Sequence, residues 1–125
     1  MKRILIVEDK ANSRELLRTV LEQQGYAVTE ARDGDEALRI VRQQAPDLVL
    51  MDLQIPSRNG FDVLQEIRKD ASLANLPVVA VTANAMPGDR EKVLAAGFTG
   101  YIAKPVALAH LRSEVSRLLE LKQPL

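Results

Sequence analysis

The sequence predicts an α/β fold in which helices cover both faces of a parallel β-sheet. Five short apolar runs alternate along the 125 residues with segments whose apolar residues recur at helical spacing. Regular alternation of this kind is typical of parallel sheets with right-handed crossovers. A chain of this length favours one domain, so we expect a single domain over residues 1–125. The expected strands span residues 4–7, 27–31, 48–51, 78–81 and 101–103.

The character of the apolar runs predicts the order of the strands. Residues 4–7, 48–51 and 78–81 are continuously apolar, as in central strands that are buried on both faces. Residues 27–31 are more mixed and residues 101–103 form a short run, so we expect these two strands at the edges. The order 2-1-3-4-5 fits this pattern and corresponds to a flavodoxin-like (βα)5 sandwich of three layers. In such a sheet, ligands bind beyond the carboxyl ends of the strands, where the chain reverses direction between strands one and three.

The segments between these runs carry apolar residues at the intervals of amphipathic helices. In the first segment we expect both Leu16 and Leu17 on the apolar side. The fourth segment is the least amphipathic, because Val93 and Leu94 are its only large apolar residues. The expected helices span residues 11–24, 33–44, 60–69 and 89–96, and a fifth begins at Leu108.

Composition and charge exclude several classes of protein. Seventeen basic and 17 acidic residues give a formal net charge of zero, which argues against sequence-independent nucleic-acid binding. The absence of cysteine excludes disulfides, thiolate metal sites and cysteine nucleophiles. The apolar run 48–51 is far too short to span a membrane, and no signal-peptide region precedes the first strand. We therefore expect a cytoplasmic protein with no nucleic-acid or membrane partner.

Polar side chains follow four of the five expected strands. Glu8 and Asp9 follow the first strand, and Asp52 ends the third. Thr82 ends the fourth strand, and Lys104 follows the fifth. Because the carboxyl ends of parallel strands meet at one edge of the sheet, we expect these side chains to lie close together. Three carboxylates in one place repel each other, so the site needs a cation or a bound proton.

These residue types favour a magnesium-dependent phosphoryl acceptor. Oxygen ligands suit Mg²⁺, with Asp9 and Asp52 as direct ligands and Glu8 acting through a water. An aspartate beside Mg²⁺, with the Lys104 ammonium and the Thr82 hydroxyl nearby, is a competent nucleophile for phosphoryl transfer. Each residue alone has an ordinary explanation, as a turn or capping aspartate, a strand threonine or a solvated lysine. Their convergence at one edge of the sheet favours the functional interpretation.

Four short motifs carry a resemblance to a known family. They are Ile-Leu-Ile-Val-Glu-Asp at 4–9, Asp-Leu-Gln-Ile-Pro at 52–56 with Gly60, Val-Thr-Ala at 81–83 and Tyr-Ile-Ala-Lys-Pro at 101–105. In this order and at these spacings the motifs are highly specific. On them the chain resembles a response-regulator receiver domain over essentially its whole length. Because it ends soon after the fifth helix, it also resembles the stand-alone, single-domain members of that family.

The resemblance implies a role for each residue of the site. Asp52 would accept a phosphoryl group from a phosphohistidine on a histidine kinase or a histidine phosphotransfer protein. Glu8, Asp9 and Asp52 would hold Mg²⁺ together with the backbone carbonyl of Gln54. Lys104 would contact the Asp52 carboxylate first and the phosphoryl oxygens afterwards. The chain would then be a signalling phosphoacceptor rather than an enzyme, because it catalyses only its own phosphorylation and dephosphorylation.

The resemblance also implies a switch. Thr82 would shift toward the phosphoryl group and Tyr101 would turn inward behind it. This movement would change the face formed by the fourth helix, the fifth strand and the fifth helix, where a downstream protein would bind. The peptide bond before the proline that matches Pro105 is commonly cis in this family. The amides Gln54 and Asn84 occupy positions that are associated with the lifetime of the acyl phosphate.

Three other functions fit the sequence less well. A flavin mononucleotide binder needs a glycine- and hydroxyl-rich phosphate loop after the first strand, whereas residues 8–12 begin with two acids. An aspartyl-phosphate hydrolase needs a second acid close behind the nucleophile, but residues 53–55 are Leu, Gln and Ile. It also needs a cap over its substrate, for which the chain has no room. A degenerate receiver that only binds partners would not need the acidic pair, Asp52, Thr82 and Lys104.

Overall fold

The computed structural model describes residues 1–83 and 88–120 and is an α/β sandwich around one five-stranded sheet. The strands are β1 (Arg3–Val7), β2 (Ala27–Ala31), β3 (Leu48–Asp52), β4 (Val78–Thr82) and β5 (Gly100–Ala103). The helices are α1 (Ala11–Gln23), α2 (Gly34–Gln44), α3 (Gly60–Lys69), α4 (Asp89–Ala95) and α5 (Leu108–Glu120), with a short 3₁₀ helix, η1 (Ala71–Leu73).

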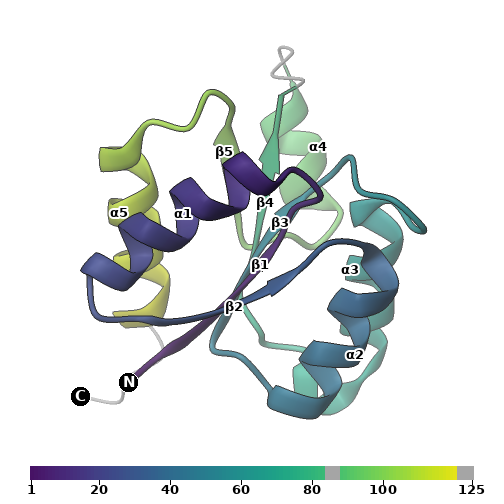
Figure 1. Ribbon diagram of the computed structural model, residues 1–125. Coiled ribbons are helices and arrows are strands. Elements are labelled where there is room, and N and C mark those ends of the chain that lie inside the picture. The colour runs from purple at the N-terminus through teal and green to yellow at the C-terminus, as the bar shows by residue number, and fades with distance from the viewer. Residues whose placement is uncertain (84–87, 121–125) are drawn as a thin grey trace.

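The topology confirms the predicted flavodoxin-like sandwich. The strands are all parallel, in the order β2-β1-β3-β4-β5. Helices α1 and α5 cover one face of the sheet, and α2, α3 and α4 lie on the other (Figure 1). The mixed strand β2 and the short strand β5 are the two edges, as predicted. The strands β3 and β4 each extend one residue beyond the apolar runs, so Asp52 and Thr82 are held within the sheet itself, in register with Val81 and Ala103.

The core has two layers because successive side chains of a strand point to opposite faces. On β1, Leu5 and Val7 pack toward α2 and α3, whereas Ile4 and Ile6 pack toward α1 and α5. All four side chains are almost completely buried. A central strand that is buried on both faces cannot slip in register without exposing apolar surface. The positions of the polar residues at its carboxyl end are therefore fixed by the core.

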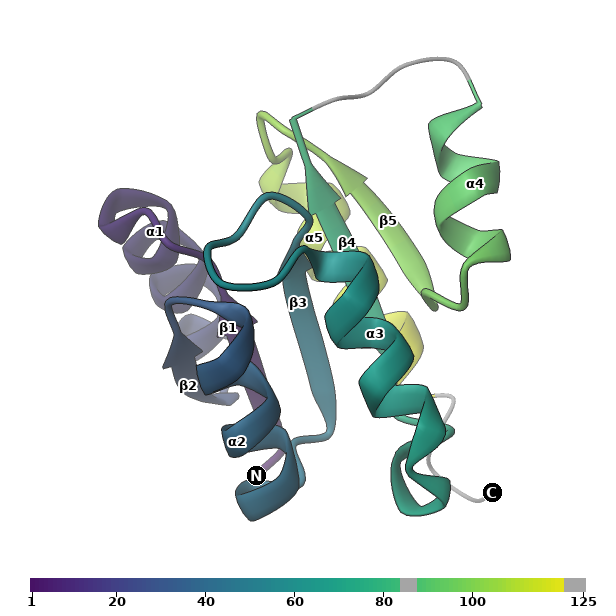
Figure 2. The same ribbon diagram turned by 90° about the vertical axis from the view of Figure 1, so that its right-hand side faces the viewer.

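Among the described residues, one large apolar side chain of α1 and one of α4 are exposed, and the exposure of Leu16 contradicts the sequence prediction. In α1, Leu17 is buried, but Leu16 is 50% exposed, because one step along a helix turns the side chain by about 100°. In α4, Val93 is buried, while Leu94 is 37% exposed. Among the described residues, α4 is therefore attached to the protein by a single buried apolar side chain of its own. Figure 2 shows α4 beside the edge strand β5, whereas α2 and α3 lie side by side.

The segment that follows α3 was not predicted from the sequence. Asp70 accepts a hydrogen bond from the backbone of Ser72, at 3.0 Å, and caps the 3₁₀ helix η1. Arg68 of α3 donates to carbonyl oxygens of Leu76, at 2.7 Å, and of Gly97, at 2.9 Å. Through these contacts, α3 holds both the segment before β4 and the segment before β5. They lie at the end of the sheet away from the acidic residues.

The described residues contain no helix that is both long and apolar enough to cross a membrane. The cytoplasmic location stays a prediction.

Candidate functional site

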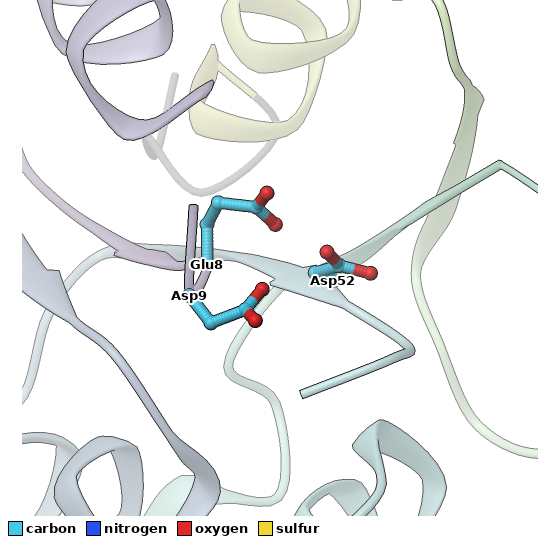
Figure 3. Close-up of side chains that lie close together, drawn as sticks. All are labelled: Glu8, Asp9 and Asp52. Atoms are coloured by element: carbon cyan, nitrogen blue, oxygen red, sulfur yellow. The ribbon is translucent and has the colours of Figure 1, made fainter. Parts of the chain in front are cut away.

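The carboxyl ends of two adjacent strands bring together three acidic side chains. Glu8 and Asp9 directly follow β1, and Asp52 is the last residue of the adjacent strand β3. Carboxylate oxygens of the three residues all lie within 4.8 Å of one another. Figure 3 shows the side chains pointing into the same space. The convergence predicted from the sequence is therefore confirmed for these acids.

Lys104, directly after β5, provides a positive charge beside the acids. The Lys104 Nζ donates to Asp52 Oδ2 at 3.1 Å and to the two Glu8 carboxylate oxygens at 3.3 and 3.4 Å. Its backbone N–H donates to the carbonyl of Thr82 at 2.8 Å, which joins the end of β4 to the segment after β5. The Lys104–Pro105 peptide bond is cis. Lys104 therefore follows the edge strand β5 and reaches across β4 to the acids at the ends of β1 and β3.

The three acids differ in exposure and in their partners. Glu8 is 2% exposed and Asp52 is 7% exposed, whereas Asp9 is exposed. Asp52 also accepts a hydrogen bond from the backbone N–H of Gln54, at 2.9 Å from Oδ1. Each oxygen of the Asp52 carboxylate is thus held by a different donor. Asp9 is thus the member of the cluster that faces solvent.

The loop after β3 packs tightly against the site. The Gly60 N–H donates to the carbonyl of Leu53 at 3.2 Å. A Cβ atom at Gly60 would lie 3.0 Å from the Leu53 Cα and 3.1 Å from the carbonyl oxygen of Asp52, so a larger residue would displace the loop. The Gln54 side chain is exposed, and the role of the Gln54 carbonyl as a metal ligand stays a prediction.

The two residues expected to switch lie on neighbouring strands. Thr82, at the end of β4, is 4% exposed, and it lines a cavity of about 340 Å³ together with Phe61 and Val93. Tyr101, on β5, is half-buried and packs against the core layer of α2, α3 and α4. Asn84 lies outside the described residues.

The charges shift the pKa values of the buried acids in opposite directions. Burial, together with the adjacent Asp52 carboxylate, raises the pKa of Glu8 from its usual 4.5 to about 7, despite the opposing Lys104 ammonium. Burial also disfavours ionised Asp52, but hydrogen bonds from Glu8, the Gln54 N–H and Lys104 outweigh it and lower the Asp52 pKa. Burial is likewise outweighed at Lys104, whose pKa is raised by both acids. Asp52 is therefore the ionised member of the buried pair.

The donor set fits a hard divalent cation. The clustered acids offer three carboxylates, which face the single ammonium of Lys104. Oxygen-rich, open sites with one or two direct carboxylate ligands suit Mg²⁺, which keeps several of its waters. The surplus of negative charge would attract such a cation, and Asp9 is the exposed member of the three. The residues thus fit the metal that the sequence predicted.

One residue of the surroundings was missed from the sequence. Arg14 of α1 donates through Nη1 to the carbonyl oxygens of both Glu8 and Asp9, each at 3.0 Å. Its Nε lies 3.1 Å from Glu30 Oε1 on the edge strand β2. The sequence carried no clear signal for this contact, because an arginine in an amphipathic helix is usually a solvated residue.

Comparison with known proteins identifies the same group of proteins by three routes. A family model described as "Response regulator receiver domain" matches residues 4–116. The polar-differentiation response regulator DivK of Brucella anthropi is 41% identical over 107 residues, which are 86% of this chain and 87% of that protein.

Two solved structures share the fold. A putative response regulator from Chloroflexus aurantiacus has a TM-score of 0.90 and 29% identity, over 95% of this chain and 98% of that one. The receiver domain of the sensor histidine kinase PA1611 from Pseudomonas aeruginosa has a TM-score of 0.87 and 37% identity, with the same coverage of both chains. That structure is described with a magnesium ion coordinated in its active site cleft.

The raised pKa of Glu8 predicts how stability depends on pH in the absence of divalent metal. Glu8 binds its proton more tightly in the folded protein, where its pKa is about 7, than in the unfolded chain, where its pKa is the usual 4.5. The stabilisation of the folded state by this proton is therefore fully present below pH 4.5. The free energy of unfolding should therefore fall as the pH rises from 4.5 through about 7. Asp52 acts in the opposite direction at lower pH, since its pKa is lowered. Urea unfolding in the presence of a chelator measures this slope.

The Glu8→Gln variant stays neutral at every pH and should flatten the slope. Glu15→Gln, at an exposed position on α1, is the matched control and should keep the slope of the unmodified protein. An equally steep slope in Glu8→Gln would contradict the assignment of the buried proton to Glu8.

Proposed function

Because the chain belongs to the response regulator receiver domain family, with the two-component phosphoacceptor role of that family, we propose that Asp52 accepts the phosphoryl group. The observation that carries this proposal is the pair of donors on its carboxylate. Lys104 Nζ lies 3.1 Å from Oδ2, and the Gln54 N–H lies 2.9 Å from Oδ1. These donors keep Asp52 ionised and oriented, which a nucleophilic carboxylate requires.

The other two acids are poorer nucleophiles. Glu8 is buried and has a pKa of about 7, so near neutral pH a large share of it carries a proton. Asp9 is exposed and, among the described residues, makes no ion pair with a cationic side chain. We assign both to holding Mg²⁺, together with Asp52 and the backbone carbonyl of Gln54. Bound Mg²⁺ would supply positive charge that offsets the phosphoryl oxygens.

The transfer step follows from these positions. An Asp52 carboxylate oxygen attacks the phosphorus of a phosphohistidine on a histidine kinase or phosphotransfer protein. The O–P bond forms as the P–N bond breaks, and the donor imidazole keeps the electron pair and takes a proton from solvent. The Lys104 ammonium, which pairs with Glu8 and Asp52, would move onto the phosphoryl oxygens. The Thr82 hydroxyl donates to a further phosphoryl oxygen.

This chemistry makes the chain a signalling phosphoacceptor that processes only its own phosphoryl group. Turnover of an outside substrate needs a second acid–base group at the leaving atom. Among the described residues, the titratable side chains that cluster with or contact the Asp52 carboxylate are Glu8, Asp9 and Lys104, and the proposal uses all three. We assign the whole of residues 1–125 to this one receiver domain, with no nucleic-acid or membrane partner.

We place the output on the face formed by α4, β5 and α5. Thr82 and Tyr101 connect this face to the phosphoryl site, since they lie on the adjacent strands β4 and β5. The cavity between Thr82 and Val93 leaves room for α4 to move. One buried apolar anchor, Val93, makes α4 easy to shift. A downstream protein would recognise the shifted face.

The acceptor assignment predicts the effect of Asp52→Asn, which keeps the shape of the side chain and removes the nucleophile. Incubation with Mg²⁺ and a small phosphoramidate, whose P–N bond matches that of phosphohistidine, should phosphorylate the unmodified protein and leave the variant unlabelled. Intact-mass spectrometry measures the product. Asp47→Asn, at the other end of β3, is the control and should react normally. Undiminished labelling of Asp52→Asn would contradict the assignment.

The switch predicts a path for the structural change. With beryllofluoride bound at Asp52 as a phosphoryl mimic, amide NMR shifts should extend from the site to Val93 and Tyr101. Thr82→Ala should abolish these remote shifts while the mimic still binds, because the hydroxyl couples the site to β4 and β5. Thr19→Ala, exposed on α1, should preserve them. Shifts confined to the loops around Asp52 in the unmodified protein would refute the proposed output face.

A further inference from the structure

The backbone on both sides of Asp9 is held by one side chain. Arg14 Nη1 lies 3.0 Å from the carbonyl oxygen of Glu8 and 3.0 Å from that of Asp9. These oxygens belong to the peptide units before and after the Asp9 Cα atom. Because each peptide unit is planar, fixing the two units fixes the φ and ψ angles of Asp9. The direction in which the Asp9 carboxylate leaves the backbone is thereby set.

The segment around Asp9 has few other restraints among the described residues. Lys10 is the N-cap residue of α1, and its side chain makes no capping hydrogen bond. Asp9 and Lys10 are both exposed. The restraint that precedes them is the Glu8 N–H, which donates to the carbonyl of Ala31 at 3.0 Å. Arg14 is therefore the side chain that restrains this segment, through the carbonyl oxygens of Glu8 and Asp9.

Arg14 is itself held in place by an ion-pair network. Its Nε lies 3.1 Å from Glu30 Oε1, and the other carboxylate oxygen of Glu30 pairs with Arg18. Glu30 lies on β2 in register with Ile6 of β1, so the network connects α1 to the strand beside the acidic pair. The Arg14 side chain is 12% exposed. A lysine has one nitrogen and cannot contact both carbonyls and Glu30 with the geometry of the guanidinium fork.

We propose that Arg14 is a positioning residue that holds Asp9 in its metal-binding orientation before Mg²⁺ arrives. The proposal rests on the metal role that the proposed function gives to Asp9. Arg14 acts on Asp9 through the backbone, because its Nε contacts Glu30 and its Nη1 contacts the two carbonyl oxygens. Its benefit is preorganisation, since metal binding need not then restrict a mobile backbone.

Whether removal of Arg14 strengthens or weakens Mg²⁺ binding distinguishes a positioning role from a purely electrostatic one. Arg14 carries a positive charge close to a site for a divalent cation, so on charge alone its removal should strengthen Mg²⁺ binding. Positioning predicts the opposite. We expect Arg14→Met to weaken Mg²⁺ binding by about tenfold, as is typical when a residue behind a metal ligand is removed. Arg14→Lys should weaken binding similarly, because it keeps the charge but loses the fork.

The experiment is a Mg²⁺ titration followed by the amide NMR shifts of Asp9 and its neighbours, without any phosphodonor. Arg18→Met is the matched control, since it removes an arginine from the same network but makes no contact with the Glu8 and Asp9 carbonyls; its Mg²⁺ affinity should stay within about twofold of the unmodified protein. Glu30→Gln, which releases one support of Arg14, should weaken Mg²⁺ binding less than Arg14→Met does. It tests the proposal independently if Arg14→Met fails to fold.

Each outcome decides the proposal. Weaker binding in Arg14→Met and Arg14→Lys, with Arg18→Met unchanged, supports it. Unchanged or tighter binding in Arg14→Met, or normal binding in Arg14→Lys, overturns it while leaving the metal site itself intact. Absence of Mg²⁺ binding in the unmodified protein overturns the metal site of the proposed function, and the role of Arg14 falls with it.

Discussion

The imbalance of charge at the carboxyl end of the sheet is the constraint on which the rest of the structure depends. Three carboxylates, from Glu8, Asp9 and Asp52, lie within 4.8 Å of one another, and Lys104 supplies one positive charge to the buried pair. Such a cluster is costly without further compensation. Without metal, part of the compensation is a proton on Glu8, whose pKa is raised to about 7. In the proposed metal-bound state, Mg²⁺ would provide this compensation in place of the proton.

The surrounding fold gives the three acids different environments. The parallel sheet places Asp52 inside the ladder, in register with Val81, where it is buried beside Lys104. Asp9 lies one residue beyond the buried Glu8, and Arg14 donates a hydrogen bond to its carbonyl oxygen. Rigid elements thus fix the acids, whereas α4, on the other side of the site, is anchored loosely. In the proposed switch, this division would allow a local change in charge to move α4 without disturbing the acids.

The sequence predicted most of the site because strand ends determine its position. Polar residues directly after continuous apolar runs placed Glu8 and Asp52 correctly, since register in a doubly buried strand is strict. Lys104 was placed correctly because it follows the short edge strand at the same end of the sheet. The contact between Arg14 and Glu30 could not be predicted, because it joins a helix side chain to an edge strand across 16 residues. It depends on the exact rotation of α1 over the sheet.

The same rotation explains why Leu16 was wrongly expected in the core. Helical periodicity identifies an apolar side but not the exact edge of the buried stripe, which the packing of Leu17 against the sheet decides. The unequal burial of Glu8 and Asp9 could not be predicted either, since two adjacent acids after a strand carry no sequence signal that distinguishes them. The 3₁₀ helix η1 depends on a local cap at Asp70 and has too few residues to show periodicity.

Thermal unfolding with and without Mg²⁺ tests the central claim most directly, namely that the acidic cluster requires a cation to balance its charge. At about ten times the dissociation constant of the metal, the melting temperature should rise by roughly 5 °C through mass action. Asp9→Asn removes one of the three negative charges and should lose most of this rise. A melting temperature that is indifferent to Mg²⁺, or an equal rise in Asp9→Asn, would contradict the account.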